Sequence, residues 1–144
     1  MYKKNLTNMK AIKKILVAIG NESSLNRCLS MAIPIAKGLA ASITCIYVIA
    51  PFPRNLQVAL EQPSRKFEKE NAEKYFKIAK EKCEESGIKF ERIIGKGQPR
   101  EAILEYEKEF DLIVIGRADW GSKLLGSVSN GVISNSKKDI ILVK

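Results

Sequence analysis

Two glycines and a serine form the pattern in this sequence that is best suited to hold an anion. A continuous apolar run, Leu112-Ile113-Val114-Ile115, ends at Gly116, and Gly126-Ser127 follows after a short loop. A buried strand that leads into one glycine, and a glycine and a hydroxyl residue that open a helix, present free backbone N–H groups to a phosphate. A structural role fits the same residues, with a glycine in a left-handed turn and a serine as helix N-cap. The sequence alone leaves both interpretations open.

The loop between these glycines contains three further residues of interest. Arg117 and Lys123 could neutralise a phosphate, or they could face solvent. Trp120, the only tryptophan, could stack on a base or meet a partner, but the interpretation we favour is that it fills space that a longer loop would occupy. The turn Gly97-Gln98-Pro99 also follows a predicted strand, and an ordinary turn with proline at the start of a helix accounts for it.

The composition excludes several kinds of chemistry. The chain has no histidine, so no Ser–His or Cys–His nucleophilic site can form. Its three cysteines, Cys28, Cys45 and Cys83, fall at apolar positions of periodic segments, which predicts buried free thiols and a reducing cytoplasm. The net charge of +9 raises the possibility of nucleic acid, but lysines and glutamates alternate and no RNA-binding motif is found, so nucleic acid is not the expected partner. The apolar runs are too short to span a membrane.

Strands and helices alternate along the chain. Continuous apolar runs predict strands, and apolar residues three and four apart predict helices. The expected strands are residues Lys14–Ile19, Ser42–Ile49, 88–94, 112–115 and 140–143, and the expected helices are about residues 25–39, 65–86, 99–109 and Ser127–Asn135. Pro34 is expected to kink the first helix or weaken one turn.

This order predicts an α/β fold. Strictly alternating elements imply an open five-stranded parallel sheet with helices on both faces, as in Rossmann-like domains. Ligands of such sheets bind beyond the carboxyl ends of the strands, where the winding reverses. Residues 11–144 are expected to form a single domain, and residues 1–10 a flexible basic arm.

Several of these pieces together resemble the universal stress protein family over nearly the whole chain. The pieces are Ile15-Leu16-Val17-Ala18-Ile19 with its turn and helix, Ile46-Tyr47-Val48, Gly97-Gln98-Pro99 with Ala102-Ile103, the run from Asp111 to Gly116, Gly126-Ser127-Val128 and Ile141-Leu142-Val143. The resemblance implies an adenine-nucleotide α-hydrolase-like sheet, usually dimerised through the last strand. Many members bind ATP through a Gly-x2-Gly-x9-Gly-[Ser/Thr] pattern and an aspartate after the first strand, and the family shares no well-defined reaction.

This chain departs from the family pattern in three places. Gly20 occupies the position of the aspartate, and Asp119 occupies that of the second glycine. The loop from Gly116 to Gly126 is three residues short of the pattern. An aspartate in a phosphate site repels the ligand, so these changes predict a weakened or lost ATP site.

The resemblance also assigns candidate binding residues. If ATP binds, with or without Mg²⁺, the base and ribose are expected beside Ala18, Gly20 and Ile43, and the phosphates beside Ile115, Gly116, Gly126, Ser127 and Val128. No catalytic or metal-ligating residue is predicted.

The expected function is that of a cytoplasmic regulatory or ligand-binding module of the universal stress type. The alternatives are a fully functional ATP-binding stress protein, a nucleotide hydrolase that uses Asp119 or Glu22, and a nucleic-acid binder. The apolar last strand, Ile140-Ile141-Leu142-Val143, lies at a predicted sheet edge and favours a homodimer through that strand.

Overall fold

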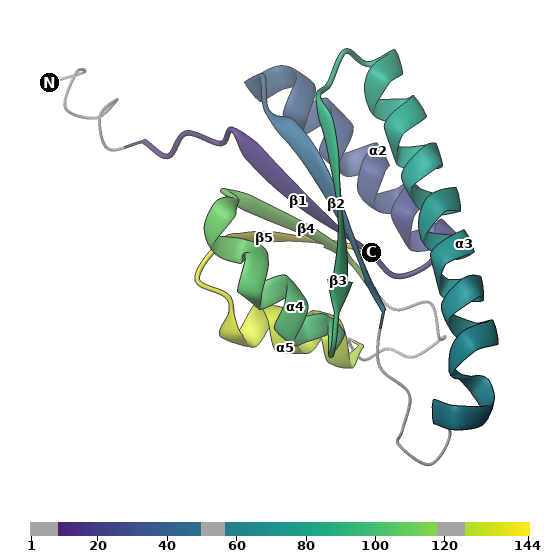
Figure 1. The fold of residues 1–144 in the computed structure, drawn as a ribbon. Coiled ribbons are helices and arrows are strands. Elements are labelled where there is room, and N and C mark those ends of the chain that lie inside the picture. The colour runs from purple at the N-terminus through teal and green to yellow at the C-terminus, as the bar shows by residue number, and fades with distance from the viewer. Residues whose placement is uncertain (1–8, 50–56, 118–125) are drawn as a thin grey trace, which may run out of the picture.

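A computed structural model describes residues 9–49, 57–117 and 126–144 of the chain. Within them five parallel strands alternate with helices (Figure 1). The elements are β1 (Lys14–Ile19), α2 (Glu22–Leu39), β2 (Ser42–Ile49), α3 (Gln57–Glu85), β3 (Phe90–Lys96), α4 (Pro99–Tyr106), η2 (Glu107–Glu109), β4 (Leu112–Gly116), α5 (Ser127–Asn135) and β5 (Asp139–Val143).

The strands form one sheet in the order β3-β2-β1-β4-β5, which confirms the predicted fold class. The chain winds outward from β1 to β3, returns to the other side of β1 as β4, and then winds outward again to β5. The winding therefore reverses between β1 and β4. Their pairing runs only from Ile15↔Leu112 to Val17↔Val114, so the two strands part before β4 ends at Gly116.

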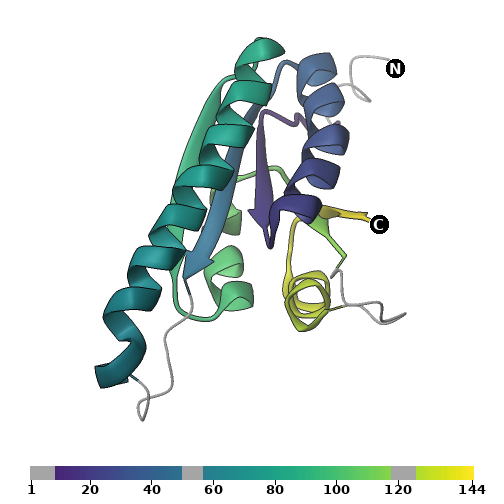
Figure 2. The same cartoon turned by 90° about the vertical axis from the view of Figure 1, so that its right-hand side faces the viewer.

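Helices cover both faces of the sheet. Helices α2 and α3 lie on one face, and α4 and α5 lie on the other (Figures 1 and 2). Successive residues of β1 point to opposite faces: Ile15 and Val17 pack in the core under α2 and α3, whereas Leu16 and Ala18 pack in the core under α4 and α5. This double burial explains why the strand is apolar throughout.

The three cysteines are buried free thiols, as predicted. All three lie in the core beneath α2 and α3. Burial raises the pKa of the Cys28 and Cys83 thiols to about 11 and that of Cys45 well above its usual range. They remain protonated at neutral pH and therefore act as small apolar side chains.

Helix α3 begins earlier than the sequence predicts. The sequence predicts a helix from about residue 65, but α3 starts at Gln57, just before a run of good helix formers, Ala59-Leu60-Glu61-Gln62. Its far end matches the prediction: Gly87 adopts a positive φ of 69°, and the N–H of Ile88 donates to the carbonyl of Cys83 (2.8 Å). Because Ile88 still caps the helix, β3 starts at Phe90, two residues later than expected.

Two smaller expectations concern the helices α2 and α4. Helix α2 remains helical through Pro34 from Glu22 to Leu39. The helix expected at residues 99–109 turns into the 3-10 segment η2 at Glu107. Gly131 of α5 lies against α4, since a Cβ there would be 2.7 Å from Arg100 Cδ.

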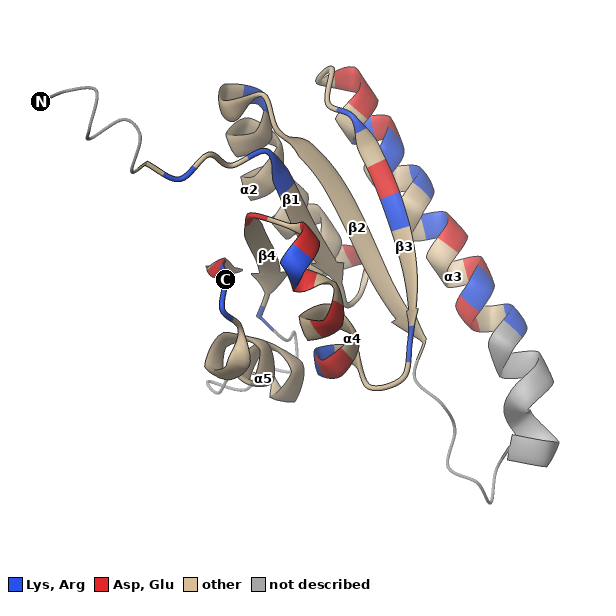
Figure 3. Ribbon diagram, turned by 60° about the vertical axis from the view of Figure 1, so that its left-hand side comes forward, with Lys and Arg blue, Asp and Glu red and all other residues tan. Residues whose placement is uncertain are grey.

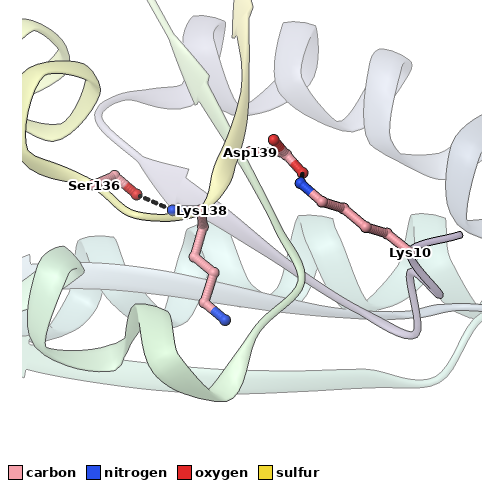
Figure 4. Close-up of polar contacts among 4 residues, drawn as sticks. All are labelled: Lys10, Ser136, Lys138 and Asp139. Carbon is pink, nitrogen blue, oxygen red and sulfur yellow. Dashed lines mark hydrogen bonds and ion pairs between the residues drawn. The ribbon is translucent and has the colours of Figure 1, made fainter. Parts of the chain in front are cut away.

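Charged side chains are spread unevenly over the fold. Lysine and glutamate alternate along α3, whereas α5 has no charged residue (Figure 3). Two of these side chains on α3 form ion pairs with other elements: Lys74 pairs with Glu22 (3.0 Å) and Glu73 with Arg92 (2.7 Å). At the amino end of the sheet, Lys10 pairs with Asp139 at the start of β5 (2.7 Å, Figure 4).

Candidate functional site

A cavity of about 610 Å³ lies at the carboxyl ends of β1, β2 and β4, where the winding of the sheet reverses. This is the position at which open α/β sheets hold their ligands, and the volume suits a small organic molecule. The described residues that line the cavity come from the predicted base-and-ribose side, from the predicted phosphate side, and from β2 and α4. They are Ala18, Ile19, Gly20, Asn21, Ser24, Ile46, Tyr47, Val48, Pro99, Ile103, Ile115, Gly116, Arg117, Gly126, Ser127, Val128 and Ser129.

The fold gathers seven of the eight candidate binding residues around this cavity. They are Ala18, Gly20, Ile115, Gly116, Gly126, Ser127 and Val128. The eighth, Ile43, does not line it. Ile43 pairs with Ile15 near the amino end of β2 and is fully buried under α2 and α3, so it lies at the other end of the strand and on the other face.

The β2 wall of the cavity comes instead from Ile46 and Val48. Both face α4 and α5, because side chains two apart share one face of a strand. The rule that the carboxyl ends of parallel strands share an edge could have selected these two residues over Ile43. With Ala18, Ile103 and Ile115 they make an apolar wall suited to a flat, weakly polar ring.

The first helix N-terminus at the cavity, that of α2, is already capped. Asn21 Oδ1 accepts from the N–H of Ser24 (2.8 Å), and Ser24 Oγ accepts from the N–H of Asn21 (3.2 Å). This reciprocal pair is a capping box. Gly20, where the family pattern has aspartate, lies just before it, and a Cβ there would be 3.3 Å from Ser24 Oγ.

The second helix N-terminus, that of α5, has no side-chain cap. Its N-cap is Gly126, with φ −62° and ψ 157°, and among the residues that the structure describes no side chain caps its leading N–H groups. The first helical hydrogen bond runs from the N–H of Asn130 to the carbonyl of Gly126 (2.9 Å). The N–H groups of residues 127–129 therefore precede the helical hydrogen bonds, at the positive end of the helix and beside the cavity.

Gly116 at the carboxyl end of β4 and Arg117 just after it are hydrogen-bonded to these two helices, and we call these two residues the exit of β4. Ser129 Oγ donates to the carbonyl of Gly116 (2.9 Å), and Arg27 Nη2 donates to the carbonyl of Arg117 (3.1 Å). Helix α2 lies so close to the strand that a Cβ on Gly116 would be 3.1 Å from Ser24 Cβ and 3.3 Å from Cys28 Sγ. Glycine at position 116 therefore has a packing role in addition to any contact with a ligand.

Arg117 is the only charged residue among the described residues that line the cavity. Carboxylates are absent from that described lining, so it favours an anionic ligand over a cation. The described part of the chain also contains no group of three Cys, Asp or Glu residues placed to hold a metal ion. The loop residues Asp119, Trp120 and Lys123, to which the sequence assigns possible roles, lie outside the described residues.

The fold and the cavity define an open, doubly wound α/β domain with a ligand-sized site at its switch point. Residues 11–144 match the model of the universal stress protein family. Universal stress protein YxiE of Bacillus subtilis (strain 168) is 30% identical over an alignment of 149 positions, which covers 91% of this chain and 98% of that protein. The chain belongs to the universal stress protein family, in agreement with the resemblance of its motifs.

Solved structures agree on the fold. Universal stress protein UspA from Lactobacillus plantarum matches with a TM-score of 0.75 at 19% identity, over 94% of this chain and all of that chain. The universal stress protein from Archaeoglobus fulgidus in complex with dAMP matches with a TM-score of 0.66 at 20% identity, over 94% of this chain and 100% of that chain. Within the described residues, no helix has the length and apolar character needed to cross a membrane.

Proposed function

We propose that this protein is a regulatory module that binds an adenine nucleotide with a short phosphate chain, such as AMP, and binds Mg-ATP weakly. The observation that supports it best is the pairing of an apolar wall with the open N-terminus of α5 in one cavity. The wall suits a base, and the open N–H groups suit a phosphate. The dAMP complex of the Archaeoglobus fulgidus relative supports a nucleotide in the corresponding fold.

Weak binding of Mg-ATP is proposed from three features of the sequence. Gly20 supplies no carboxylate at the end of β1, Asp119 replaces a glycine, and the loop between Gly116 and Gly126 is short. A negative charge in place of a glycine opposes a triphosphate more than a monophosphate, because the triphosphate has more charge to accommodate. A shortened loop also offers fewer backbone N–H groups to the outer phosphates.

Calorimetric titration tests this function. We expect a dissociation constant for Mg-ATP above about 100 µM and tighter binding of AMP. Gly126→Val places a branched side chain at the start of α5 and should abolish AMP binding. The matched control is Gly38→Val in α2, where an added Cβ would meet nothing within 4 Å. Micromolar binding of Mg-ATP that is lost in Gly126→Val would contradict the weakened site, and a failure of every adenine nucleotide to bind would contradict the function.

The proposed role is binding and not catalysis. The chain lacks histidine, and its buried thiols have raised pKa values, so neither supplies a base or nucleophile at neutral pH. Phosphate release from ATP above background that disappears in Asp119→Asn would instead support the hydrolase alternative. We further propose that residues 11–144 form one domain in a reducing cytoplasm and that the protein acts in stress responses, as is expected of this family.

We also propose a homodimer through β5. This edge strand pairs only with β4 among the described strands, and Ile140, Ile141 and Leu142 remain partly exposed on it. An apolar sheet edge of this kind favours pairing with a second copy. Light scattering at micromolar concentration should give twice the monomer mass, and Ile141→Lys should reduce it; a monomeric wild type would contradict the proposal.

A further inference from the structure

The exit of β4 poses an electrostatic problem for any anion in the cavity. In a parallel sheet, the carbonyl groups of a strand normally accept hydrogen bonds from the N–H groups of neighbouring strands. The pairing of β1 with β4 stops at Val17↔Val114, so Gly116 has a strand partner only on the β5 side, at Val143. Beyond this point the strand cannot satisfy its own carbonyls on the β1 side, and a bare carbonyl oxygen beside the cavity would repel a phosphate.

Two side chains from different helices satisfy consecutive carbonyls at this exit. Ser129 of α5 donates to the carbonyl of Gly116 (2.9 Å), and Ser129 is only 3% exposed. Arg27 of α2 donates through Nη2 to the carbonyl of Arg117 (3.1 Å) and through Nη1 to Ser23 Oγ (2.8 Å). The N–H of Arg117 donates to the carbonyl of Val143 (2.9 Å), which fixes this peptide on its other side.

We propose that Ser129 and Arg27 are positioning residues for the phosphate of the bound nucleotide: by holding the carbonyls of Gly116 and Arg117, they keep acceptor oxygens from the anion and leave the N–H groups of α5 to meet it. This inference rests on the proposed function. It adds that the cavity has two parts with different roles. The apolar wall recognises the base, and the capped strand exit determines whether a charged phosphate is accepted. Arg27 does not line the cavity, so it acts through the peptide of Arg117 and not by touching the ligand.

This division predicts which ligands each variant affects. Ser129→Ala removes the donor to Gly116, and Arg27→Gln removes the guanidinium that holds the Arg117 carbonyl. One lost hydrogen bond of this kind should weaken binding of AMP about fivefold. Binding of adenosine, which has the base and sugar but no phosphate, should change by less than about twofold, because the apolar wall is untouched. Arg27→Lys keeps both charge and a donor and should retain most of the AMP affinity.

Two control variants separate these effects from nonspecific ones. Ser136→Ala removes a serine hydroxyl from the other end of α5, where it donates to Glu107. Lys37→Gln removes one positive charge from the last turn of α2, far along the helix from Arg27. Neither control should change the ratio of AMP to adenosine affinity.

The experiment is calorimetric titration of the full-length wild type and these variants with AMP and adenosine, with thermal unfolding measured for each variant. A selective loss of AMP affinity in Ser129→Ala and Arg27→Gln supports the inference. An equal loss for AMP and adenosine, or no loss for either, overturns it while leaving the proposed function intact. A wild type that binds neither ligand overturns both. If Ser129→Ala does not fold, the Arg27→Gln and Arg27→Lys pair decides the result.

Discussion

Two helix N-termini meet the same cavity, and only the N-cap residue of α2 accepts a hydrogen bond from its own helix with its side chain. At α2, Asn21 and Ser24 cap each other's N–H groups, so the helical donor of Ser24 is already used, whereas those of Glu22 and Ser23 are not part of the capping box. At α5, Gly126 has no side chain to accept a hydrogen bond, and no side chain in the described part of the chain caps the leading N–H groups. The comparison teaches that the placement of a helix end alone does not make it an anion site, because the chemistry of the N-cap residue decides how many of the leading donors are free.

A substitution that gives α5 a side-chain N-cap, such as α2 has, should have the largest effect on AMP binding. Gly126→Asp adds a side chain that accepts from the leading N–H groups and introduces a negative charge. We expect AMP affinity to fall by more than about tenfold, while thermal stability rises or stays constant because the helix gains a cap worth a few tenths of a kcal/mol.

Gly126→Asn separates the two contributions of that variant. It supplies a cap without the charge, so it should weaken AMP binding less than Gly126→Asp does. Calorimetry and thermal unfolding measure both quantities. A stable Gly126→Asp protein that binds AMP as tightly as the wild type would show that the α5 end is not the anion site.

A side chain added between α2 and β4 should have the next largest effect, and this effect is on stability. Gly116→Ala places a Cβ 3.1 Å from Ser24 Cβ, and the two packed backbones have little room to separate. Overpacking of this kind costs about 1–3 kcal/mol of unfolding free energy. Gly131→Ala is the matched control: its Cβ meets only the flexible Arg100 side chain, and the gain in helix propensity of about 1 kcal/mol offsets the crowding. Urea denaturation that shows equal losses for both variants would contradict the close α2–β4 packing.

Removing the α2 cap should affect stability more than it affects AMP binding. Asn21→Ala deletes the side chain that accepts from Ser24 and should lower the unfolding free energy by about 1 kcal/mol. AMP affinity should change little, since the α2 donors are not assigned to the phosphate. A large loss of AMP affinity at unchanged stability would reverse the roles of the two helix ends.

The smallest effect is expected at the amino end of the sheet, where a carboxylate also uses backbone donors. Asp111 Oδ2 accepts from the N–H groups of Lys13 (2.9 Å) and Lys14 (3.0 Å). These bonds, that of Lys13 first, hold the pKa of Asp111 below its usual range. A carboxyl with a lowered folded-state pKa contributes stability above its unfolded pKa of about 3.9 and loses it as the pH falls through the folded value.

Asp111→Asn should therefore flatten the acid side of the stability curve slightly and leave AMP binding at neutral pH unchanged. Thermal unfolding between about pH 2 and pH 6 measures this. An acid limb identical to that of the wild type would mean that the two backbone bonds do not act on the carboxylate.

Much of the fold follows from the sequence because it depends on local patterns. The strands Lys14–Ile19 and Ser42–Ile49 and the helix Ser127–Asn135 have the predicted bounds, since continuous apolar runs and turn residues mark them. The start of α3 at Gln57 could not be predicted from periodicity, because the segment before residue 65 shows no clear apolar stripe, and propensity alone is a weak guide.

The site could be predicted only in part. Glycines at strand ends are visible in the sequence, and they line the cavity. The misplacement of Ile43 arose because a position carried over from a family pattern does not state which end of a strand it occupies. The roles of Ser129 and Arg27 depend on where β1 and β4 part, and no local pattern encodes that three-dimensional feature.

The most direct test of the account is an NMR titration of ¹⁵N-labelled protein with AMP. The account predicts large shifts of the backbone amide signals of Ser127 and Val128, with little change at Glu22 and Ser23 in the capped first turn of α2. Shifts confined to the α2 turn, or an absence of shifts at the start of α5 when AMP is bound, would contradict it.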